Sequence, residues 1–202
     1  MQVDLDQLAR ALATLAAPGV VTGARLITAT DVQLLHDLEH AKVAHAVPRR
    51  QYEFASGRAL LRGLLGTADT IPVGPSRAPH LPLGVVGSLA HDREVVVAAV
   101  TRDPAVTALG IDVEPAEPLS DDMARVILRD DEARIDAHLA FTLKEAAYKA
   151  WSTSGGRMLD HHEVRVSTDG EHFTATVFPD GRQLRGRFAT VAGRHLALVH
   201  IP

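Results

Sequence analysis

A pair of strands that occurs twice along the chain limits the folds available to it. Residues 84–90 and 94–101 are predicted strands joined by a short turn, because β-branched residues run between turn-forming ones. The segment GSLAH from Gly87, followed by EVVVAAV, resembles GRFAT from Gly186, followed by RHLALVHI. Similarity within one chain indicates repeated structural units. We therefore expect two related halves, each with a small antiparallel sheet and a long helix.

The two long helices of these halves are predicted from continuous runs of helix-forming residues. Pro48 begins a helix that ends at Leu65, where Gly66 follows as a stop signal. The stretch FTLKEAAYKA lies in a second helix, from about 138 to 153. The other expected elements are helices over 4–17, 30–46 and 120–129, a short helix from Asp131, and strands over 20–28, 108–114, 162–168, 171–178, 182–191 and 194–201.

The length of 202 residues suits one sizeable core or two small halves packed closely together. We expect an α+β fold that forms one compact unit. Residues 1–105 make the N-terminal half, with the arginine-bearing helix and the GSLAH segment. Residues 106–202 make the C-terminal half, with the stretch GIDVEP, the KEAAYK helix and the last strands.

Composition excludes several kinds of site and partner. The chain has no cysteine, which excludes disulfides, thiolate metal sites and cysteine nucleophiles. A net charge of −4, from 21 basic and 25 acidic residues, does not indicate nucleic-acid binding. No apolar run approaches the ~20 residues that cross a bilayer, and the start, MQVDLDQLAR, lacks the basic region of a secretory signal. We expect a cytoplasmic protein with no membrane or nucleic-acid partner.

The stretch GIDVEP (110–115) puts two carboxylates on one face of a strand. Because side chains alternate, Ile111 and Val113 point into a core while Asp112 and Glu114 point together the other way. Two such carboxylates repel unless a cation joins them. Mg²⁺ suits them, since it binds one or two carboxylates together with phosphate oxygens and water. A strand with a solvated acidic face gives the same pattern, so the spacing leaves both interpretations open.

Three charges of FTLKEAAYKA lie close together on their helix. Lys144, Glu145 and Lys149 fall within an arc of about 140°. Glu145 and Lys149 have the favourable i, i+4 order, which is worth only ~0.3–0.5 kcal/mol if exposed. Alternatively, Glu145 supplies a third carboxylate to a metal held by Asp112 and Glu114, and the lysines meet phosphates that the metal bridges.

The order of these motifs resembles the 4′-phosphopantetheinyl transferase superfamily, in its longer single-chain, surfactin- and enterobactin-type branch. That branch has an arginine-bearing helix, then WP-x-G-x-x-GS-x-x-H, G-x-D-x-E and [FW]-x-x-KEA-x-x-K. Here the corresponding segments are Arg50 to Arg58, Pro82 to His91, Gly110 to Glu114 and Phe141 to Lys149. Together they cover roughly residues 49–151.

The resemblance implies a reaction and its participants. The 4′-phosphopantetheine group would pass from coenzyme A to a serine of an apo acyl or peptidyl carrier protein, with release of 3′,5′-ADP. Mg²⁺ would be the cofactor, with Mn²⁺ as the alternative metal. Carriers of fatty acid, polyketide, nonribosomal peptide or siderophore synthesis are all open, and secondary-metabolite biosynthesis is the expected setting. We expect a monomer, because the two halves mimic a dimer.

The resemblance also implies a role for each matching residue. Asp112, Glu114 and Glu145 would hold the metal, and Glu145 would also activate the attacking serine, directly or through water. Lys144 would act at the pyrophosphate or support the leaving group. The residues expected to contact coenzyme A are Arg50, Arg58, Arg77, Ser88, His91 and Lys149.

The chain departs from the family pattern at two positions near the histidine. Ala90 stands where Ser or Thr is usual, and Leu81 replaces the tryptophan. The missing hydroxyl at Ala90 supports a second hypothesis, a non-catalytic coenzyme A-binding module that regulates a partner. A third hypothesis is a metal-dependent phosphohydrolase that uses the same carboxylates.

Overall fold

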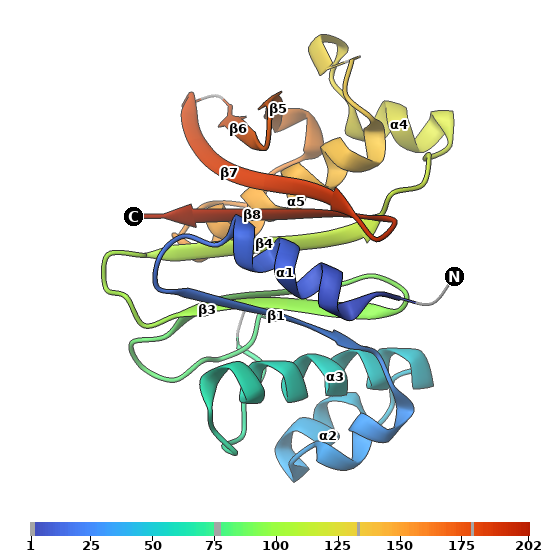
Figure 1. The fold of residues 1–202 in the computed structure, drawn as a ribbon, viewed down its shortest axis with the longest axis vertical. Coiled ribbons are helices and arrows are strands. Elements are labelled where there is room, and N and C mark those ends of the chain that lie inside the picture. The colour runs from blue at the N-terminus through green and yellow to red at the C-terminus, as the bar shows by residue number, and fades with distance from the viewer. Residues whose placement is uncertain (1–2, 75–77, 133, 179) are drawn as a thin grey trace.

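Two antiparallel sheets carry the fold in the computed structural model, which describes residues 3–74, 78–132, 134–178 and 180–202 (Figure 1). The first sheet has the strand order β1-β3-β2 and the second has the order β4-β8-β7-β6-β5. The strands are β1 (Val20–Leu26), β2 (Val86–His91), β3 (Val95–Thr101), β4 (Ala108–Pro115), β5 (Val164–Asp169), β6 (His172–Val177), β7 (Arg182–Val191) and β8 (Arg194–Ile201). The α-helices are α1 (Leu5–Leu15), α2 (Asp37–Val43), α3 (Pro48–Leu65), α4 (Asp121–Ile127) and α5 (Ala137–Thr153). Short 3₁₀ helices are η1 (Ala29–Leu34), η2 (Asp130–Glu132) and η3 (His161–Glu163).

The two sheets repeat one arrangement. In the first, β1 pairs with β3 and β3 with β2; in the second, β4 pairs with β8 and β8 with β7. A long helix follows the first strand of each set, α3 after β1 and α5 after β4. Gly87 faces Val100 and Gly186 faces Val199 in the strand registers, so the two segments that resemble each other occupy matching places. The expected α+β class with two antiparallel sheets is confirmed.

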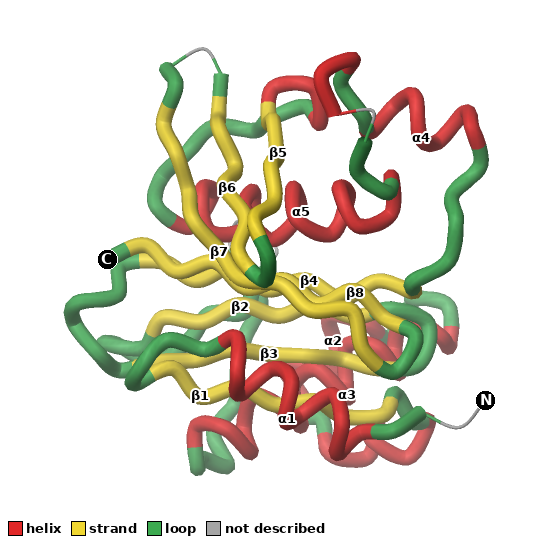
Figure 2. The backbone as a smooth tube through the Cα atoms, turned by 45° about the horizontal axis from the view of Figure 1, so that its top comes forward, coloured by secondary structure: helices red, strands yellow, loops and turns green. Residues whose placement is uncertain are grey.

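The apolar core fills the space between the sheets and beneath each long helix. Strand β2 lies beside β4, and α1 covers the remaining opening between the sheets (Figure 2). The central cluster joins Leu8 and Leu12 of α1 to Val97 of β3, Ile111 of β4 and Leu198 of β8. Alternate residues of the same strands face outward, toward α3 on one sheet and α5 on the other. The two halves therefore share one core.

Helix α5 approaches β4 unusually closely at Gly110. A Cβ at this position would collide with the carbonyl oxygen of Ala146 on the helix. Ala146, Ala147 and Ala150 are almost fully buried, and small side chains on both elements let the backbones meet. This approach places Lys149 of α5 directly against Asp112 of β4.

The segment 30–46 differs from its prediction as one helix. It divides into η1 and α2, because Leu35 and His36 adopt extended backbone angles between them. His36 begins α2, and its backbone N–H donates to the carboxylate of Glu39. That carboxylate also binds Arg62 of α3, with an Nη1–Oε1 distance of 2.8 Å. Tertiary pairing of Glu39 thus decides where this helix starts. The other predicted elements lie within a few residues of their observed bounds.

The predicted boundary between residues 105 and 106 lies in the turn from β3 to β4. Among the described helices, none combines the length and apolar character needed to cross a membrane.

Candidate active site

Asp112 is buried on the face of β4 that looks toward α5. Its side chain is one of the least exposed charged groups of the chain, and Lys149 of α5 donates to its Oδ1 over 2.6 Å. The same ammonium group donates to the carbonyl oxygen of Ile111 at 3.1 Å. The second carboxylate oxygen, Oδ2, is buried and has no hydrogen-bond partner. The alternative of a solvated acidic strand face is therefore wrong for Asp112.

Three carboxyl groups near this point all have raised pKa values. Burial raises the pKa of Asp112 to about 6, despite the lowering effect of Lys149. Burial and then the charge of Asp112 raise the pKa of Glu114 to about 8. Burial also raises the pKa of Glu145, and Lys149 opposes that shift. Raised pKa values mean that ionisation of these three carboxyl groups is unfavourable, and a bound cation would stabilise their ionised forms.

This donor set fits a divalent metal ion of the hard, oxygen-binding kind. The unpartnered Oδ2 of Asp112 is a buried polar atom that lacks a partner, which costs free energy unless a ligand supplies one. Carboxylate oxygens are the protein ligands that Mg²⁺ and Mn²⁺ prefer. Within the described residues, no group of three or more histidine and carboxylate side chains lies close enough together to hold a metal ion, so Asp112, Glu114 and Glu145 are not gathered as a three-carboxylate site. The arrangement matches Mg²⁺, which takes one or two carboxylates and keeps several waters.

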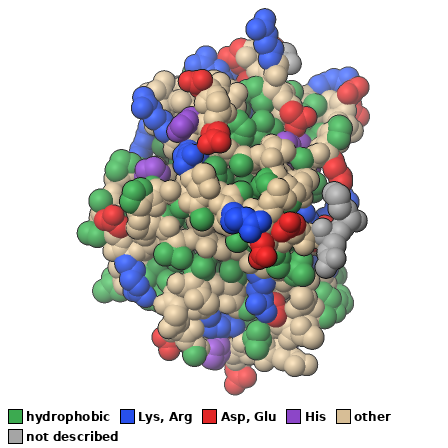
Figure 3. Space-filling model, in the orientation of Figure 1, with side chains coloured by type: hydrophobic (Ala, Val, Ile, Leu, Met, Phe, Trp, Pro, Cys, Tyr) green, Lys and Arg blue, Asp and Glu red, His purple; other side chains and the backbone are tan. Residues whose placement is uncertain are grey.

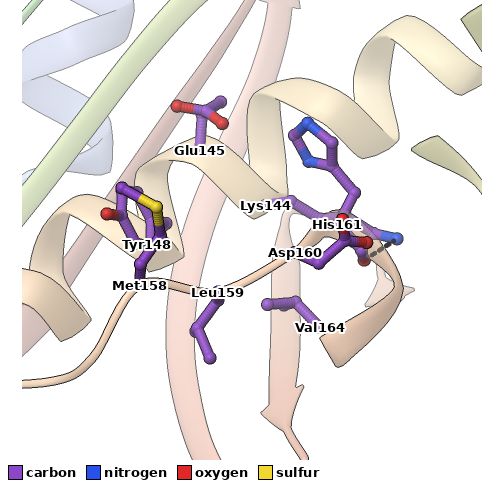
Figure 4. Close-up of a pocket in the computed structure, with 8 residues that line it drawn as sticks. All are labelled: Lys144, Glu145, Tyr148, Met158, Leu159, Asp160, His161 and Val164. Atoms are coloured by element: carbon purple, nitrogen blue, oxygen red, sulfur yellow. Dashed lines mark hydrogen bonds between the residues drawn. The ribbon is translucent and has the colours of Figure 1, made fainter. Parts of the chain in front are cut away.

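Glu145 and Lys144 leave α5 in different directions (Figure 4). Glu145 lines a cavity of about 160 Å³ together with Tyr148, Met158 and His161. Lys144 also lines this cavity, but its Nζ points away from Glu145 and lies 2.6 Å from Glu132 Oε2. The helical arc that groups the three charges is therefore a poor guide to where their side-chain ends lie.

Lys144 is an almost fully buried structural residue. Its Nζ donates to Glu132, to the carbonyl oxygen of Ile127 and to that of His161 at 3.0 Å. Those three donations use all the protons of an ammonium group. The expectation that Lys144 contacts the pyrophosphate or the leaving group stays a prediction, and the pairing of its charge with Glu132 in the core argues against it. Its partners tie η2, α4 and η3 to α5.

Residues of the N-terminal half form a second, basic wall near the carboxylates. Arg50 Nη1 lies 3.1 Å from His91 Nε2, and both contact Glu53, at 3.4 Å and 3.6 Å. His91 and Glu114 line the same cavity, whose volume is about 390 Å³. Arg49 and Arg93 also line it. Cations from α3 and the β2–β3 turn thus face a carboxylate of β4 across one hollow.

Comparison with known proteins decides what this arrangement is. Residues 38–101 match the family model described as the 4′-phosphopantetheinyl transferase N-terminal domain, and residues 108–199 match the 4′-phosphopantetheinyl transferase superfamily. The 4′-phosphopantetheinyl transferase Svp of Streptomyces mobaraensis is 37% identical over 175 residues, which span 77% of this chain and 71% of Svp. The chain belongs to the 4′-phosphopantetheinyl transferase superfamily.

Two other relatives are a second protein named 4′-phosphopantetheinyl transferase and a component of enterobactin synthase. The 4′-phosphopantetheinyl transferase Npt of Nocardia iowensis is 30% identical over 172 residues, or 78% of this chain and 77% of Npt. Enterobactin synthase component D of Salmonella typhimurium is 29% identical over 136 residues, or 58% of this chain and 56% of that protein. The chain is thus a 4′-phosphopantetheinyl transferase, and the resemblance of its motifs is confirmed.

Two residues expected at the coenzyme A site have structural contacts in this transferase. Ser88 Oγ accepts a hydrogen bond of 3.1 Å from the backbone N–H of Ile111, at the junction between the two sheets. Arg58 is buried, donates from Nε to the carbonyl oxygen of Ile71 over 2.7 Å, and stacks on the ring of Phe54. Neither side chain is brought to the cavity by these contacts. Arg77 lies outside the described residues.

Two features of the transferase's cavity lie outside the sequence motifs. His138 of α5 lines it, donates from Nδ1 to the carbonyl oxygen of Glu117 over 2.7 Å, and holds Nε2 3.5 Å from Glu114 Oε2. His138 precedes Glu145 by two helical turns, a spacing that places both on one side of α5. The second feature is an ion pair between Asp92 and Arg194. A separation of about a hundred residues along the chain gives no local pattern that could have predicted it.

Proposed function

We propose that this transferase moves the 4′-phosphopantetheine group of coenzyme A to a serine of an apo acyl or peptidyl carrier protein and releases 3′,5′-ADP. The observation that carries the proposal is the cavity shared by the cationic wall around His91 and the carboxylate wall around Glu114. Coenzyme A bears phosphate groups at two separated points, and a metal-bridged diphosphate needs both cations and carboxylates. Asp112, Glu114 and Glu145 are the residues that would hold Mg²⁺, with Mn²⁺ as the alternative.

The chain's own cations would orient the substrate. We propose that His91, which lines the cavity, and Arg50, whose Nη1 lies 3.1 Å from His91 Nε2, receive one phosphate group. Lys149 donates two of its three ammonium protons, one to Asp112 and one to the Ile111 carbonyl oxygen. The third is available to a phosphate oxygen. Such fixed donors lower the barrier by holding the diphosphate in line with the attacking hydroxyl.

Glu145 is the residue proposed to receive the proton of the attacking serine. A general base works best when its pKa is near the working pH, and burial raises the pKa of Glu145 from its ordinary value. The serine oxygen would then form its bond to the β-phosphorus while the bond to the leaving 3′,5′-ADP oxygen breaks. A bound metal would neutralise the charge that develops on the departing phosphate oxygen of 3′,5′-ADP as the diphosphate is cleaved.

The non-catalytic alternative depended on Ala90, and its position weakens that argument. The Ala90 side chain is buried in the central apolar cluster, with Val95 and Val97. His91, the next residue of β2, faces the opposite side of the strand and the cavity. A hydroxyl at position 90 would therefore enter the core, so its absence does not remove a group from the ligand's wall.

The oligomeric state, cellular location and partners of the enzyme belong to the same proposal. We propose that the enzyme acts as a cytoplasmic monomer, because its two repeated halves already form both walls of the cavity within one chain. On the face shown in Figure 3, acidic and basic side chains are interspersed with apolar ones and form no broad basic area. This fits a small-molecule substrate and a protein carrier better than a nucleic acid.

The proposal is tested by incubating the protein with coenzyme A, MgCl₂ and a panel of apo acyl and peptidyl carrier proteins. We expect one carrier to gain the mass of one phosphopantetheine group and an equal amount of 3′,5′-ADP to appear. A carrier whose serine is replaced by alanine is the matched control. Release of nucleotide without any carrier would instead support the phosphohydrolase. Tight coenzyme A binding with no modified carrier would favour the regulatory module.

A further inference from the structure

Arg194, the first residue of β8, forms a buried ion pair with the turn between β2 and β3. Its Nε donates to Asp92 Oδ2 over 2.6 Å, and its Nη2 donates to Glu94 Oε2 over 2.6 Å. Arg194 and Asp92 are 7% and 6% exposed. Since the turn belongs to the N-terminal half and β8 to the C-terminal half, this pair joins the two halves. We call it the Asp92–Arg194 clasp.

Asp92 also shapes the turn from within. Its Oδ1 accepts hydrogen bonds from the backbone N–H groups of Glu94 and Val95, each over 2.7 Å. Oδ1 of Asp92 therefore stabilises the turn, while Oδ2 binds Arg194 in the C-terminal half of the protein. His91 immediately precedes Asp92, so the clasp holds the residue that begins the basic wall.

The other end of the clasp is attached to the acidic wall. Arg194 is the register partner of Pro115, the neighbour of Glu114 on β4. Asp92, Pro115, His91 and Glu114 all line the cavity of about 390 Å³. The clasp is thus a direct link between the wall that carries His91 and the wall that carries Glu114.

Holding the halves together does not require this ion pair. The central apolar cluster already joins α1, β3, β4 and β8. Buried ion pairs add little net stability compared with apolar residues, because desolvation offsets their attraction. What an ion pair adds is a defined geometry, and here that geometry lies between the wall that carries His91 and the wall that carries Glu114.

We propose that the Asp92–Arg194 clasp is a positioning device that sets the separation of the two walls, and thereby the preference for a ligand that carries a 3′-phosphate in addition to its diphosphate. The inference rests on the proposed function, in which coenzyme A spans the cavity with its diphosphate at the carboxylates and its 3′-phosphate at His91. A ligand held at two points gains from both only when their separation is fixed in advance. Without the clasp, the diphosphate end still binds but the 3′-phosphate no longer adds affinity.

The test compares coenzyme A with 3′-dephospho-coenzyme A by calorimetry in the presence of Mg²⁺. The clasp variant is the double substitution Asp92→Asn with Arg194→Met, in which the asparagine oxygen can still accept from Glu94 and Val95 and no buried charge is left unpaired. The control is Arg187→Met, which removes a different arginine pair, that with Glu171. Thermal unfolding of each full-length variant confirms that it folds.

We expect the wild type to bind coenzyme A more tightly than 3′-dephospho-coenzyme A. In the clasp variant, the ratio of these two affinities should fall about tenfold, equivalent to about 1.4 kcal/mol. Its affinity for dephospho-coenzyme A should stay within about twofold of wild type. In a His91→Ala background, breaking the clasp should cause no further loss, since the clasp acts through His91. Arg187→Met should leave the preference unchanged.

Other outcomes overturn the inference. Equal weakening of both ligands means that the pair serves only folding, and no change means that it positions nothing. A wild type without any preference for coenzyme A excludes a 3′-phosphate contact and the clasp's role together. Failure of the proposed function gives a different result: the wild type would bind coenzyme A with this preference but would modify no carrier.

Discussion

Lys149 and Asp112 are joined across the contact between α5 and β4, with 2.6 Å between Nζ and Oδ1. The pairing is one-sided, because Oδ2 of the same carboxylate is buried and unpartnered. One oxygen is therefore neutralised by a fixed cation and the other is left for a ligand. This division suits a carboxylate that binds a metal while its orientation is held by the protein.

The first prediction concerns Asp112. Replacement by Asn keeps the shape but removes the charge, so we expect the transfer rate to fall at least about a hundredfold. Metal affinity, measured by electron paramagnetic resonance with Mn²⁺, should fall in parallel. The matched control is Asp122→Asn on exposed α4, where an acid pairs with Arg125 at the surface. Wild-type Mn²⁺ affinity in Asp112→Asn would remove Asp112 from the metal site.

The second prediction follows from the raised pKa values of Asp112, about 6, and Glu114, about 8. A carboxyl with a raised pKa in the folded state contributes stability below its unfolded pKa and loses it as pH rises through the folded value. Without metal, the unfolding temperature should therefore fall from about pH 4 to about pH 8. Mg²⁺ should restore it, most strongly at the upper end, because the metal binds the ionised carboxylates.

The control for this pH dependence is the double variant Asp112→Asn with Glu114→Gln, measured with EDTA and with Mg²⁺. Removing both titrating groups should flatten the metal-free profile and abolish the effect of Mg²⁺. All other titrating groups are common to both proteins, so the difference between the two profiles isolates this pair. Identical profiles in the variant and the wild type would show that these carboxylates do not titrate as described.

Much of the fold could be predicted because its signals are local. Pro48 and Gly66 mark the ends of α3, and the resemblance between the segments at Gly87 and Gly186 corresponds to matching strands. The prediction of one helix over residues 30–46 was wrong, because the start of α2 depends on Glu39, which pairs with Arg62 in another helix. A helix boundary set by a tertiary ion pair leaves little trace in neighbouring residues.

Prediction of the candidate site from sequence was also limited by contacts between residues far apart in the chain. Strand alternation correctly put Asp112 and Ile111 on opposite faces. It could not show that Ser88, in the motif's GS element, accepts from the N–H of Ile111 rather than facing a ligand. Nor could helical spacing show that Lys144 is buried against Glu132, since that partner lies on a separate short helix. Type and order of residues are readable from sequence, while the direction of a long side chain depends on packing.

The third prediction separates the two lysines of α5. Lys144→Met leaves the Glu132 carboxylate buried without its cation, so we expect a loss of about 3–5 kcal/mol of stability. The folded fraction should retain its transfer rate, because the Lys144 ammonium group gives all three of its protons to Glu132 and to the carbonyl oxygens of Ile127 and His161. Lys149→Met should do the opposite, with a large loss of rate and a small change in unfolding temperature. Denaturant unfolding and single-turnover transfer are the two measurements.

A compensating variant sharpens this prediction. Lys144→Met combined with Glu132→Gln removes both charges, and we expect part of the stability to return, since no uncompensated charge stays in the core. If Lys144 instead served the diphosphate, the compensated variant would be stable and inactive. That result would return Lys144 to the catalytic residues.

The fourth prediction tests the close approach that places Lys149 over Asp112. In Gly110→Ala, the new methyl group would collide with the Ala146 carbonyl, so α5 must move away from β4. Overpacking of this kind costs about 1–3 kcal/mol, and moving the helix should also weaken Mn²⁺ binding, because Glu145 and Lys149 move with it. The matched control is Gly63→Ala at an exposed position of α3, where a Cβ meets nothing within 4 Å and alanine should add up to about 1 kcal/mol of helix stability. Unfolding and Mn²⁺ titration of both variants decide the matter: an unchanged metal affinity in Gly110→Ala would mean that the site does not depend on this contact.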